Sequence, residues 1–170
     1  MQIRALAPTD AVDFVSIRLR GLAECPEAFA SSYDEESSTP LTEIERRLQP
    51  NSGSVIFGAF KGNTLCAVVG LQRESMVKLE HKAFIWGVYV APEFRTRGTG
   101  TRILGHALHH AMAVMGTRQV NLGVNTSNLA AVSLYKKLGF TEYGLERGFL
   151  QVGGRLYDEY QMVYRARSSA

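Results

Sequence analysis

A strand runs through a tight turn into a helix in the stretch Val88-Tyr89-Val90-Ala91-Pro92-Glu93-Phe94-Arg95-Thr96-Arg97-Gly98-Thr99-Gly100-Thr101. Its two glycines allow the backbone to turn tightly and to come close to a ligand. Free N–H groups at the start of the following helix would point at phosphate oxygens, with the positive end of the helix dipole behind them. This junction predicts a site for the pyrophosphate of a nucleotide-like cofactor.

Two common nucleotide-binding loops do not fit this turn. A Walker loop needs a glycine, four residues and then Gly-Lys-Ser/Thr, a run that the chain lacks. A dinucleotide fingerprint needs a third glycine, where Ile103 stands, and an acidic residue about twenty positions further on, where Val120 and Asn121 stand. What remains is Arg-x-x-Gly-x-Gly, followed later in the chain by Asn128-Leu129-Ala130-Ala131-Val132-Ser133-Leu134-Tyr135-Lys136-Lys137-Leu138-Gly139-Phe140.

This pair of motifs resembles the GNAT superfamily of acetyl-CoA-dependent N-acetyltransferases. In that family Arg/Gln-x-x-Gly-x-Gly/Ala cradles the coenzyme A pyrophosphate. A helix with the pattern Asn-x-x-Ala-x-x-Leu-Tyr-x-x-x-Gly-Phe lies beside the pantetheine and the thiol. Both patterns occur here in the right order and at the right separation, and the resemblance covers residues 82–145. It implies acetyl-CoA as the acetyl donor, with no metal.

The resemblance also implies which residues hold the cofactor. Backbone amides from Arg95 to Thr101 bind the pyrophosphate, helped by the side chains of Arg95, Arg97 and Thr101. The preceding strand offers main-chain groups to the pantetheine and the acetyl carbonyl, as an added strand would, and one N–H near Val88 serves as oxyanion donor. In the family this strand bulges and splays from the next one, here residues 120–124. The implied set is Val88, Tyr89, Val90, Arg95, Thr96, Arg97, Gly98, Thr99, Gly100, Thr101, Asn128, Ala131 and Tyr135.

Tyr135 is the expected catalytic acid. It lies two helical turns past Asn128. Asn128 can act as the N-cap of this helix, and the family also places this residue near the pantetheine. The departing thiolate must collect a proton, and a thiol of pKa about 8.5 can take one from a nearby phenol. The structural alternative is a tyrosine that covers the core with its hydroxyl in water.

The general base is not identified by the motifs. An amine of pKa near 10 must lose a proton before it attacks. Some family members carry a glutamate near the position of Phe84, and the ribosomal-protein alanine acetyltransferases carry one at the position of Gly123, so both carboxylates are missing here. Glu80, His81 and Glu24 remain as candidates, with water as a relay. Holding the amine against the thioester would itself supply much of the acceleration.

Aromatic and acidic residues are candidates for the acceptor pocket. Trp86 and Tyr89 are expected on opposite faces of one strand, so that only one of them faces the pocket. Phe29 and Tyr33 lie in the segment where the family builds its acceptor site, next to the acidic residues 34–36. Carboxylates there would attract a cationic amine. The alternative is a solvated loop ahead of a helix.

Two other groups of side chains are read as structural. His106, His109 and His110 have a spacing at which two histidines can share a metal, but no acidic or cysteine ligand stands in the same helix. They lie opposite the apolar stripe, which predicts a solvated helix face. Cys25 and Cys66 show no metal or redox spacing and lie outside both motifs, which predicts reduced side chains and no covalent thiol route.

The pattern of apolar residues predicts the order of the elements. Strands are expected at residues 3–6, 55–60, 65–72, 83–90, 120–124, 140–152 and 155–164. Helices are expected at residues 8–21, 40–48 and 128–138, and from the glycine turn to its C-cap at Gly116. Thr39 is the expected N-cap of the second helix and Pro40 its first residue. Residues 23–40 are expected to be irregular. Strand–helix alternation between antiparallel hairpins predicts an α/β (mixed α+β) fold. It would have a mixed, mostly antiparallel sheet of about six to seven strands and helices on both faces.

The composition sets the broad class. A chain of 170 residues, 45% hydrophobic and 21% charged, predicts one domain over residues 1–165 with a frayed tail at 166–170. A net charge of +3 suits an anionic small ligand and does not favour nucleic acid. No apolar stretch approaches a membrane span and the start lacks a signal-peptide core, so a cytoplasmic protein is expected. A homodimer through the closing hairpin or a free sheet edge is the candidate assembly.

Three functions remain open from the sequence. The first is an N-acetyltransferase that moves the acetyl group of acetyl-CoA to a primary amine by direct attack in a ternary complex. Its acceptor is a small or amino-acid-like molecule, with a peptide N-terminus or lysine as the alternative. The second is a non-catalytic acyl-CoA-binding sensor. The third is a phosphate-ligand protein unrelated to coenzyme A, and fold likeness alone does not separate the three.

Overall fold

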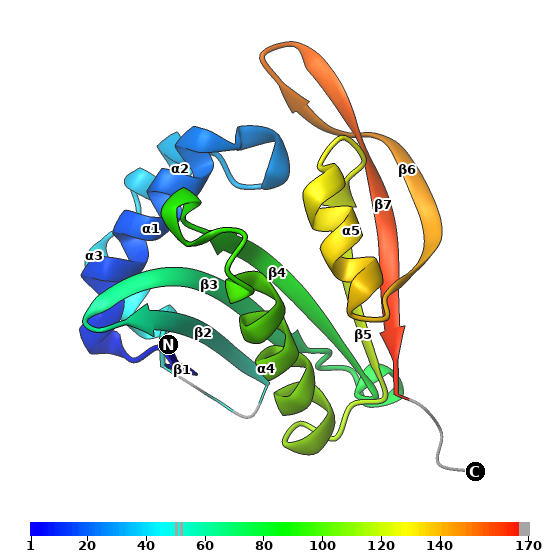
Figure 1. Cartoon of the computed structure of the whole chain (residues 1–170), viewed down its shortest axis with the longest axis horizontal. Coiled ribbons are helices and arrows are strands. Elements are labelled where there is room, and N and C mark those ends of the chain that lie inside the picture. The colour runs from blue at the N-terminus through cyan, green and yellow to red at the C-terminus, as the bar shows by residue number, and fades with distance from the viewer. Residues whose placement is uncertain (50, 52, 167–170) are drawn as a thin grey trace.

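A computed structural model describes residues 1–49, 51 and 53–166 of the chain, and the expected fraying of residues 167–170 lies outside them. Seven strands in this part form one sheet in the order β1-β2-β3-β4-β5-β7-β6 (Figure 1). All neighbours are antiparallel except β4 and β5, which are parallel. This confirms the predicted mixed, mostly antiparallel sheet. The strands are β1 (Gln2–Ala5), β2 (Ser54–Lys61), β3 (Thr64–Arg73), β4 (Lys82–Val90), β5 (Gln119–Asn125), β6 (Thr141–Val152) and β7 (Arg155–Arg165).

Helices cover both faces of the sheet, as predicted. Figure 1 shows α4 and α5 in front of it and α1 to α3 gathered at the other side. The α-helices are α1 (Ala11–Glu24), α2 (Tyr33–Ser37), α3 (Leu41–Arg47), α4 (Thr99–Ala113) and α5 (Leu129–Lys137). Four 3-10 turns are η1 (Pro8–Asp10), η2 (Pro26–Ala28), η3 (Val77–Leu79) and η4 (Pro92–Phe94).

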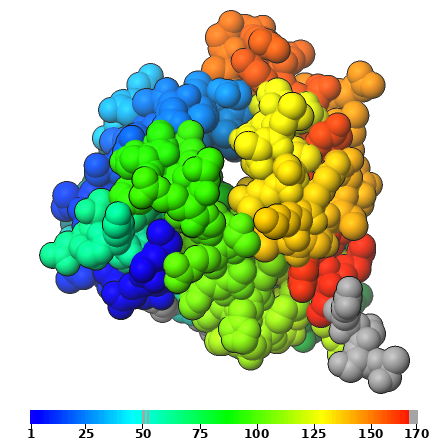
Figure 2. All heavy atoms as spheres, viewed as in Figure 1, coloured from blue at the N-terminus to red at the C-terminus, as the bar shows by residue number. Residues whose placement is uncertain are grey.

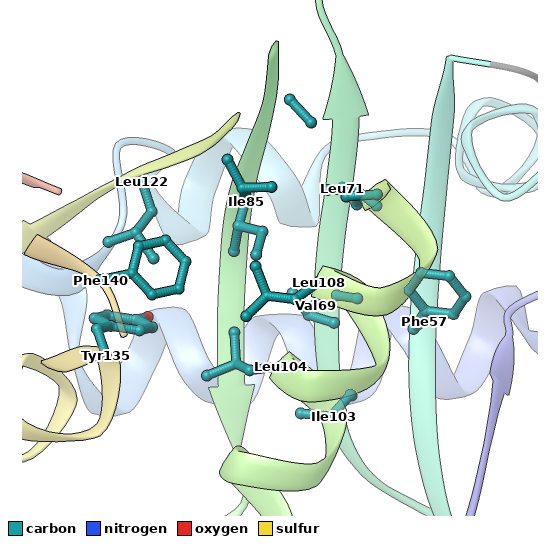
Figure 3. Close-up of a cluster of buried hydrophobic side chains, with 14 of the residues drawn as sticks. Phe57, Val69, Leu71, Ile85, Ile103, Leu104, Leu108, Leu122, Tyr135 and Phe140 are labelled. Atoms are coloured by element: carbon teal, nitrogen blue, oxygen red, sulfur yellow. The ribbon is translucent and has the colours of Figure 1, made fainter. Parts of the chain in front are cut away.

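Each face of the sheet has its own apolar core. On the α4 face, Ile103, Leu104 and Leu108 point from the helix at Val69 and Ile85 of the strands (Figure 3). On the other face, α1 and α3 pack against a second cluster of buried side chains. The middle strands are thus packed between two apolar layers, and β4 and β5, which carry the candidate site, are among them.

Truncating a side chain in the apolar core beneath α4 is expected to lower the free energy of unfolding strongly. Leu104 is 0% exposed, and removal of a buried leucine side chain costs about 2–5 kcal/mol because a cavity remains. Leu104→Ala should therefore lower the free energy of unfolding by that amount in urea denaturation. Leu129→Ala is the control, since Leu129 is 74% exposed and surface changes stay within about 0.5 kcal/mol. Equal costs for the two variants would contradict this assignment of the core.

Three local expectations are corrected by the structure. Pro40, and not Thr39, is the N-cap of α3, because the Thr39 hydroxyl instead donates to the Glu35 carbonyl oxygen at 3.1 Å. The segment expected to be irregular contains η2 and α2, and α2 begins with a reciprocal cap between Ser32 and Glu35. Helix α4 ends with Val114 as C-cap, and Gly116 takes a left-handed φ of 68° beyond it.

Candidate functional site

The turn before α4 has a backbone suited to binding an anion. Gly98, the N-cap of α4, has a left-handed φ of 75°, and a Cβ added there would meet nothing within 4 Å. Among the described residues, Thr96 is the only non-glycine with a positive φ, at 61°. Such strain is common where a ligand binds. The first N–H groups of α4 lack partners within the helix, so the turn presents donors at the positive end of a 15-residue helix.

The side chain of Arg95 is already paired within the protein. Its guanidinium pairs with Glu24 of α1 at 2.6 Å and its Nε donates to the carbonyl oxygen of Val90 at 2.9 Å. The Tyr89 hydroxyl donates to the same Glu24 carboxylate at 2.7 Å. Arg97, in contrast, is exposed beside the turn. Arg97 is therefore an exposed basic side chain at the turn without an ion-pair partner among the described residues.

Strands β4 and β5 diverge beyond a short paired segment. Their parallel pairing covers residues 82–84 of β4 and 119–121 of β5, and from Ile85 onward the described chain places no strand on that side of β4. Figure 1 shows the two strands meeting at one end and spreading apart at the other. The main-chain groups of β4 along the spread, those of Val88 included, thus have no strand partner on this side among the described residues. The carbonyl oxygen of Val90 is the one already bonded, to Arg95.

A cavity of about 430 Å³ lies in this spread. It reaches from the glycine turn, past α5, through the sheet to the segment after α1. The space-filling view shows an opening between the green segment that leads into α4 and the yellow α5 (Figure 2). Most of the predicted site residues line it: Phe29, Trp86, Val88, Tyr89, Val90, Arg95, Thr96, Gly100, Asn128, Ala131 and Tyr135. The other predicted residues do not line the cavity: Tyr33, Arg97, Gly98, Thr99 and Thr101.

The predicted residues that do not line the cavity lie in different surroundings. Gly98 and Arg97 form the exposed outer side of the turn. Thr99 is buried, and its Oγ1 has no hydrogen-bond partner among the described residues. Tyr33 is 46% exposed at the start of α2, so the prediction that it lines the acceptor pocket finds no support here.

A bulge in β4 sets which side chains face the acceptor end of the cavity. The register with β3 shifts between the pairs Val68–Tyr89 and Gly70–Trp86, and Gly87 within this step has a φ of 62°. The extra residue brings Trp86 and Tyr89 to the same face, where both pack in the cluster next to α1. The expectation that they lie on opposite faces was wrong, because a bulge interrupts the alternation of a strand.

Helix α5 brings Tyr135 to the cavity as the spacing from Asn128 predicts. Asn128 is confirmed as N-cap, since its side chain accepts from the N–H of Ala131 at 3.1 Å. Tyr135 is 6% exposed and lines the cavity. Its hydroxyl has no hydrogen bond to any described residue, and burial raises the pKa of this phenol above its ordinary value. At neutral pH the phenol is therefore a protonated donor that faces the space where a ligand would lie.

The structure supplies a carboxylate that the motifs did not reveal. Glu159 of β7 lies against Gly123 of β5, so closely that a Cβ on Gly123 would collide with the Glu159 Oε1. Gly123 lines the cavity. Burial raises the pKa of Glu159, and the Glu146 charge on β6 adds to this effect. The Glu159 carboxylate thus occupies the space that a side chain at residue 123 would fill, a contact between strands that the motifs do not encode.

The three loosely suggested bases lie elsewhere. Glu80 and His81 precede β4 at the closed end of the β4–β5 pair, and Glu80 pairs with Arg73 at 3.2 Å. Glu24 is engaged by Tyr89 and by Arg95. Of these acidic side chains, Glu159 is therefore the one that both contacts a residue lining the cavity and lacks a cationic partner of its own among the described residues.

The histidines and cysteines are only partly as expected. His106 and His110 pack edge-on against the Phe57 ring, with ring centroids 4.8 and 5.1 Å apart, and burial lowers the pKa of both. The expectation of a solvated face holds for His109 alone. No cluster in the described residues could hold a metal ion. Both cysteines are unpaired, and Cys25 lines the cavity with its pKa raised by burial, which disfavours a thiolate.

Comparison with known proteins agrees with this architecture. A family model described as the acetyltransferase (GNAT) family matches residues 21–140. The N-alpha-acetyltransferase RimI of Mycobacterium tuberculosis is 29% identical over 157 residues, covering 92% of this chain and 94% of that protein. An uncharacterized protein of Mycobacterium leprae is 30% identical over 144 residues, which cover 84% of this chain. The chain spans only 38% of that longer relative, and 36% of an uncharacterized N-acetyltransferase of Methanocaldococcus jannaschii.

Solved structures share the whole fold. A GNAT-family acetyltransferase of Streptococcus pneumoniae has a TM-score of 0.87 at 24% identity, covering 96% of this chain and 98% of that one. The yncA protein of Salmonella typhimurium, solved with its cofactor acetyl-CoA, has a TM-score of 0.81 at 19% identity, covering 100% and 96%. These likenesses show that the chain has the fold of these two structures. Because the family model matches well over half of its length, the chain belongs to the acetyltransferase (GNAT) family.

Proposed function

We propose that this protein is an N-acetyltransferase that moves the acetyl group of acetyl-CoA to the primary amine of a small, amino-acid-like acceptor. One observation supports this most: a single cavity joins the anion-binding turn, the Tyr135 phenol and the gap between β4 and β5. A donor entering from the turn and an acceptor entering from the α1 side would meet within the sheet. The direct reaction then needs no acyl-enzyme.

The residues present fit coenzyme A at one end of the cavity. The left-handed backbone at Thr96 and Gly98 and the first N–H groups of α4 suit a pyrophosphate, with Arg97 beside them. The unpaired edge of β4 near Val88 suits the amide groups of pantetheine, as an added strand would. Bound there, acetyl-CoA would supply an acetyl group activated as a thioester.

Two side chains can move the protons that the transfer requires. Glu159 takes the proton from the acceptor ammonium, directly or through water, and leaves a neutral amine. The amine nitrogen forms a bond to the acetyl carbonyl carbon, and the C–S bond breaks. Tyr135 gives its proton to the departing sulfur, and the resulting phenolate takes the excess proton of the new amide nitrogen through water. Glu159 then releases the proton that it accepted to solvent. The raised pKa of each group keeps Tyr135 protonated and makes Glu159 a stronger base than an exposed glutamate.

The decisive experiment mixes the protein with acetyl-CoA and a panel of primary amines. Release of free thiol together with the mass of an acetylated acceptor supports the proposal, and thiol release without such a product does not. Peptides with free N-termini belong in the panel, because one relative is named an N-alpha-acetyltransferase. Coenzyme A binding with no product from any acceptor would favour the sensor.

Coenzyme A binding at the turn gives a separate prediction. At 100 times its Kd, coenzyme A should add about 2.7 kcal/mol to the free energy of unfolding. Gly98→Ala should weaken binding about tenfold, because alanine would let the free turn relax from the left-handed conformation, and restoring that conformation for the pyrophosphate costs roughly 1–2 kcal/mol. Gly105→Ala is the matched control on the same helix, where a Cβ meets nothing within 4 Å. No stabilisation of the unsubstituted protein would reject the cofactor.

A further inference from the structure

A buried guanidinium next to the site has an unused hydrogen-bond donor. Arg18 extends from α1, and its side chain is only 7% exposed. Its Nη2 donates to the Ser31 hydroxyl at 3.2 Å and to the Glu36 carboxylate at 3.5 Å. Its Nη1 is fully buried and has no hydrogen-bond partner among the described residues. An unpaired buried donor is costly, so its persistence calls for an explanation.

The unused donor lies directly behind residues that line the acceptor end of the cavity. Gly87, at the bulge of β4, lines the cavity, and Arg18 Nη1 lies 3.5 Å from the position that a Cβ would take there. No other atom beyond the neighbouring residues lies within 4 Å of that position. Phe29, which also lines the cavity, lies under the guanidinium, with its ring centroid 4.8 Å from the Cζ of Arg18. A small acceptor group above Gly87 would thus come within reach of Nη1.

The charge near Arg18 is only partly compensated. Its one carboxylate partner, Glu36, is shared with Arg47 of α3, and each N···O distance is 3.5 Å. Arg47 also pairs with Glu43 at 3.3 Å, and Glu43 pairs in turn with Arg46, so the cluster holds three guanidinium groups and two carboxylates, an excess of one positive charge. Because Arg18 is buried, water screens that charge poorly. An anionic group of the acceptor would satisfy both the free donor and the excess charge.

We propose that Arg18 binds a carboxylate of the acceptor, so that the substrates are molecules carrying both a primary amine and a carboxylate. This inference rests on the proposed function and narrows its substrate class. Arginine presents two N–H groups on Nη1 and suits planar carboxylates. A polyamine would leave the donor unpaired and would bring further positive charge next to Arg18. The carboxylate of the acceptor therefore lies above Gly87, and its amine faces the gap between β4 and β5.

The first test uses the unsubstituted protein and needs no change to its fold. Free amino acids are compared with their α-amides, and with a polyamine, as acceptors of the acetyl group. We expect kcat/KM for the better amino acids to exceed that of their amides by at least about tenfold, because a charged hydrogen bond is lost. Equal values for acid and amide, or a preference for the polyamine, would overturn the inference.

The second test assigns the preference to Arg18. Arg18→Gln should bring kcat/KM for acid and amide to within about twofold of each other, with most activity on the amide retained. Gly87→Ala, which fills the space beside Nη1 with Arg18 intact, should reduce the same preference. Arg20→Gln is the matched control, because Arg20 lies on the same helix and pairs with Glu93 at the surface. A preference that survives in folded Arg18→Gln, as checked by its melting temperature, would exclude Arg18.

A binding measurement separates this inference from the proposed function. Calorimetry on the coenzyme A-loaded protein compares N-acetyl amino acids with their amides and requires no turnover. Tighter binding of the carboxylates that disappears in Arg18→Gln supports the carboxylate site even if no amine is acetylated. Acetylation of amines with no such difference supports the transferase and rejects the site.

Discussion

Tyr135→Phe is expected to lower kcat by about 100-fold or more while leaving the Kd of acetyl-CoA within about threefold, since a positioned acid contributes roughly 10²–10⁴ to a rate. The phenol faces the cavity without a hydrogen bond to any described residue, so its loss removes a proton donor and little packing. The thiolate would then leave without a proton from the protein. Steady-state kinetics with a good acceptor, together with calorimetry of acetyl-CoA, separates the two effects.

The control for this change lies on the same side of the sheet. Tyr164 of β7 packs against Phe140, which also contacts the Tyr135 ring, with centroid distances of 5.7 and 5.8 Å. Tyr164→Phe removes a hydroxyl next to the same aromatic cluster without touching the cavity, and it should leave kcat unchanged. An unaltered kcat in Tyr135→Phe would remove Tyr135 from the mechanism. An equal loss in both variants would point to packing instead of proton transfer.

Glu159→Gln is expected to lower kcat/KM by about 100-fold at neutral pH, because the acceptor ammonium loses the carboxylate that accepts its proton. The amide keeps the shape of the side chain and an oxygen that can accept from Gln161, which donates to Glu159 at 2.8 Å. Folding raises the pKa of Glu159, so its ionised form costs folding free energy at neutral pH. The variant should therefore be as stable as the parent, and the loss of activity cannot be assigned to unfolding.

The dependence of the activity on pH provides a second test of Glu159. A base works in its ionised form, so activity should fall as the pH drops through the raised pKa of Glu159. In Glu159→Gln this acidic limb should be absent. Glu146→Gln, the matched control at the paired position of β6, should keep the activity plateau and shift the limb to lower pH, since Glu146 raises the pKa of Glu159. An acidic limb that persists in Glu159→Gln would assign the base to another group.

Sequence patterns predicted the positions of the glycine turn and of Tyr135 better than the arrangement of residues at the α1 end of the cavity. The turn at Gly98 and the helix of Tyr135 could be predicted because each motif lies in one short, continuous segment of the chain. The acceptor end depends on contacts between distant segments: β7 brings Glu159 to Gly123, and α1 brings Arg18 to Gly87. Such pairings follow from strand register and helix packing, which a local pattern does not encode.

The same distinction explains the errors in detail. The alternation rule misplaced Trp86 relative to Tyr89 because a bulge adds a residue to the strand. The rule for helix starts chose Thr39, whose hydroxyl is taken by the preceding helix. The helical period correctly placed Ile103 and Leu104 on the buried face of α4. It also predicted a solvated face for the histidines, but the sheet extends far enough beneath α4 for Phe57 to contact His106 and His110. In each case a tertiary neighbour overrode a correct local rule.

The bulge at Gly87 also bears on how relatives of this chain could diverge. Side chains of a strand alternate between faces, so a deletion of one residue at the bulge would invert the facing of every later residue in β4. Tyr89 would then turn toward α4, while Val88 and Val90 would turn toward α1. A single-codon insertion or deletion at this point can therefore exchange the β4 side chains that face the two sides of the sheet in one step, without any change in the residues themselves.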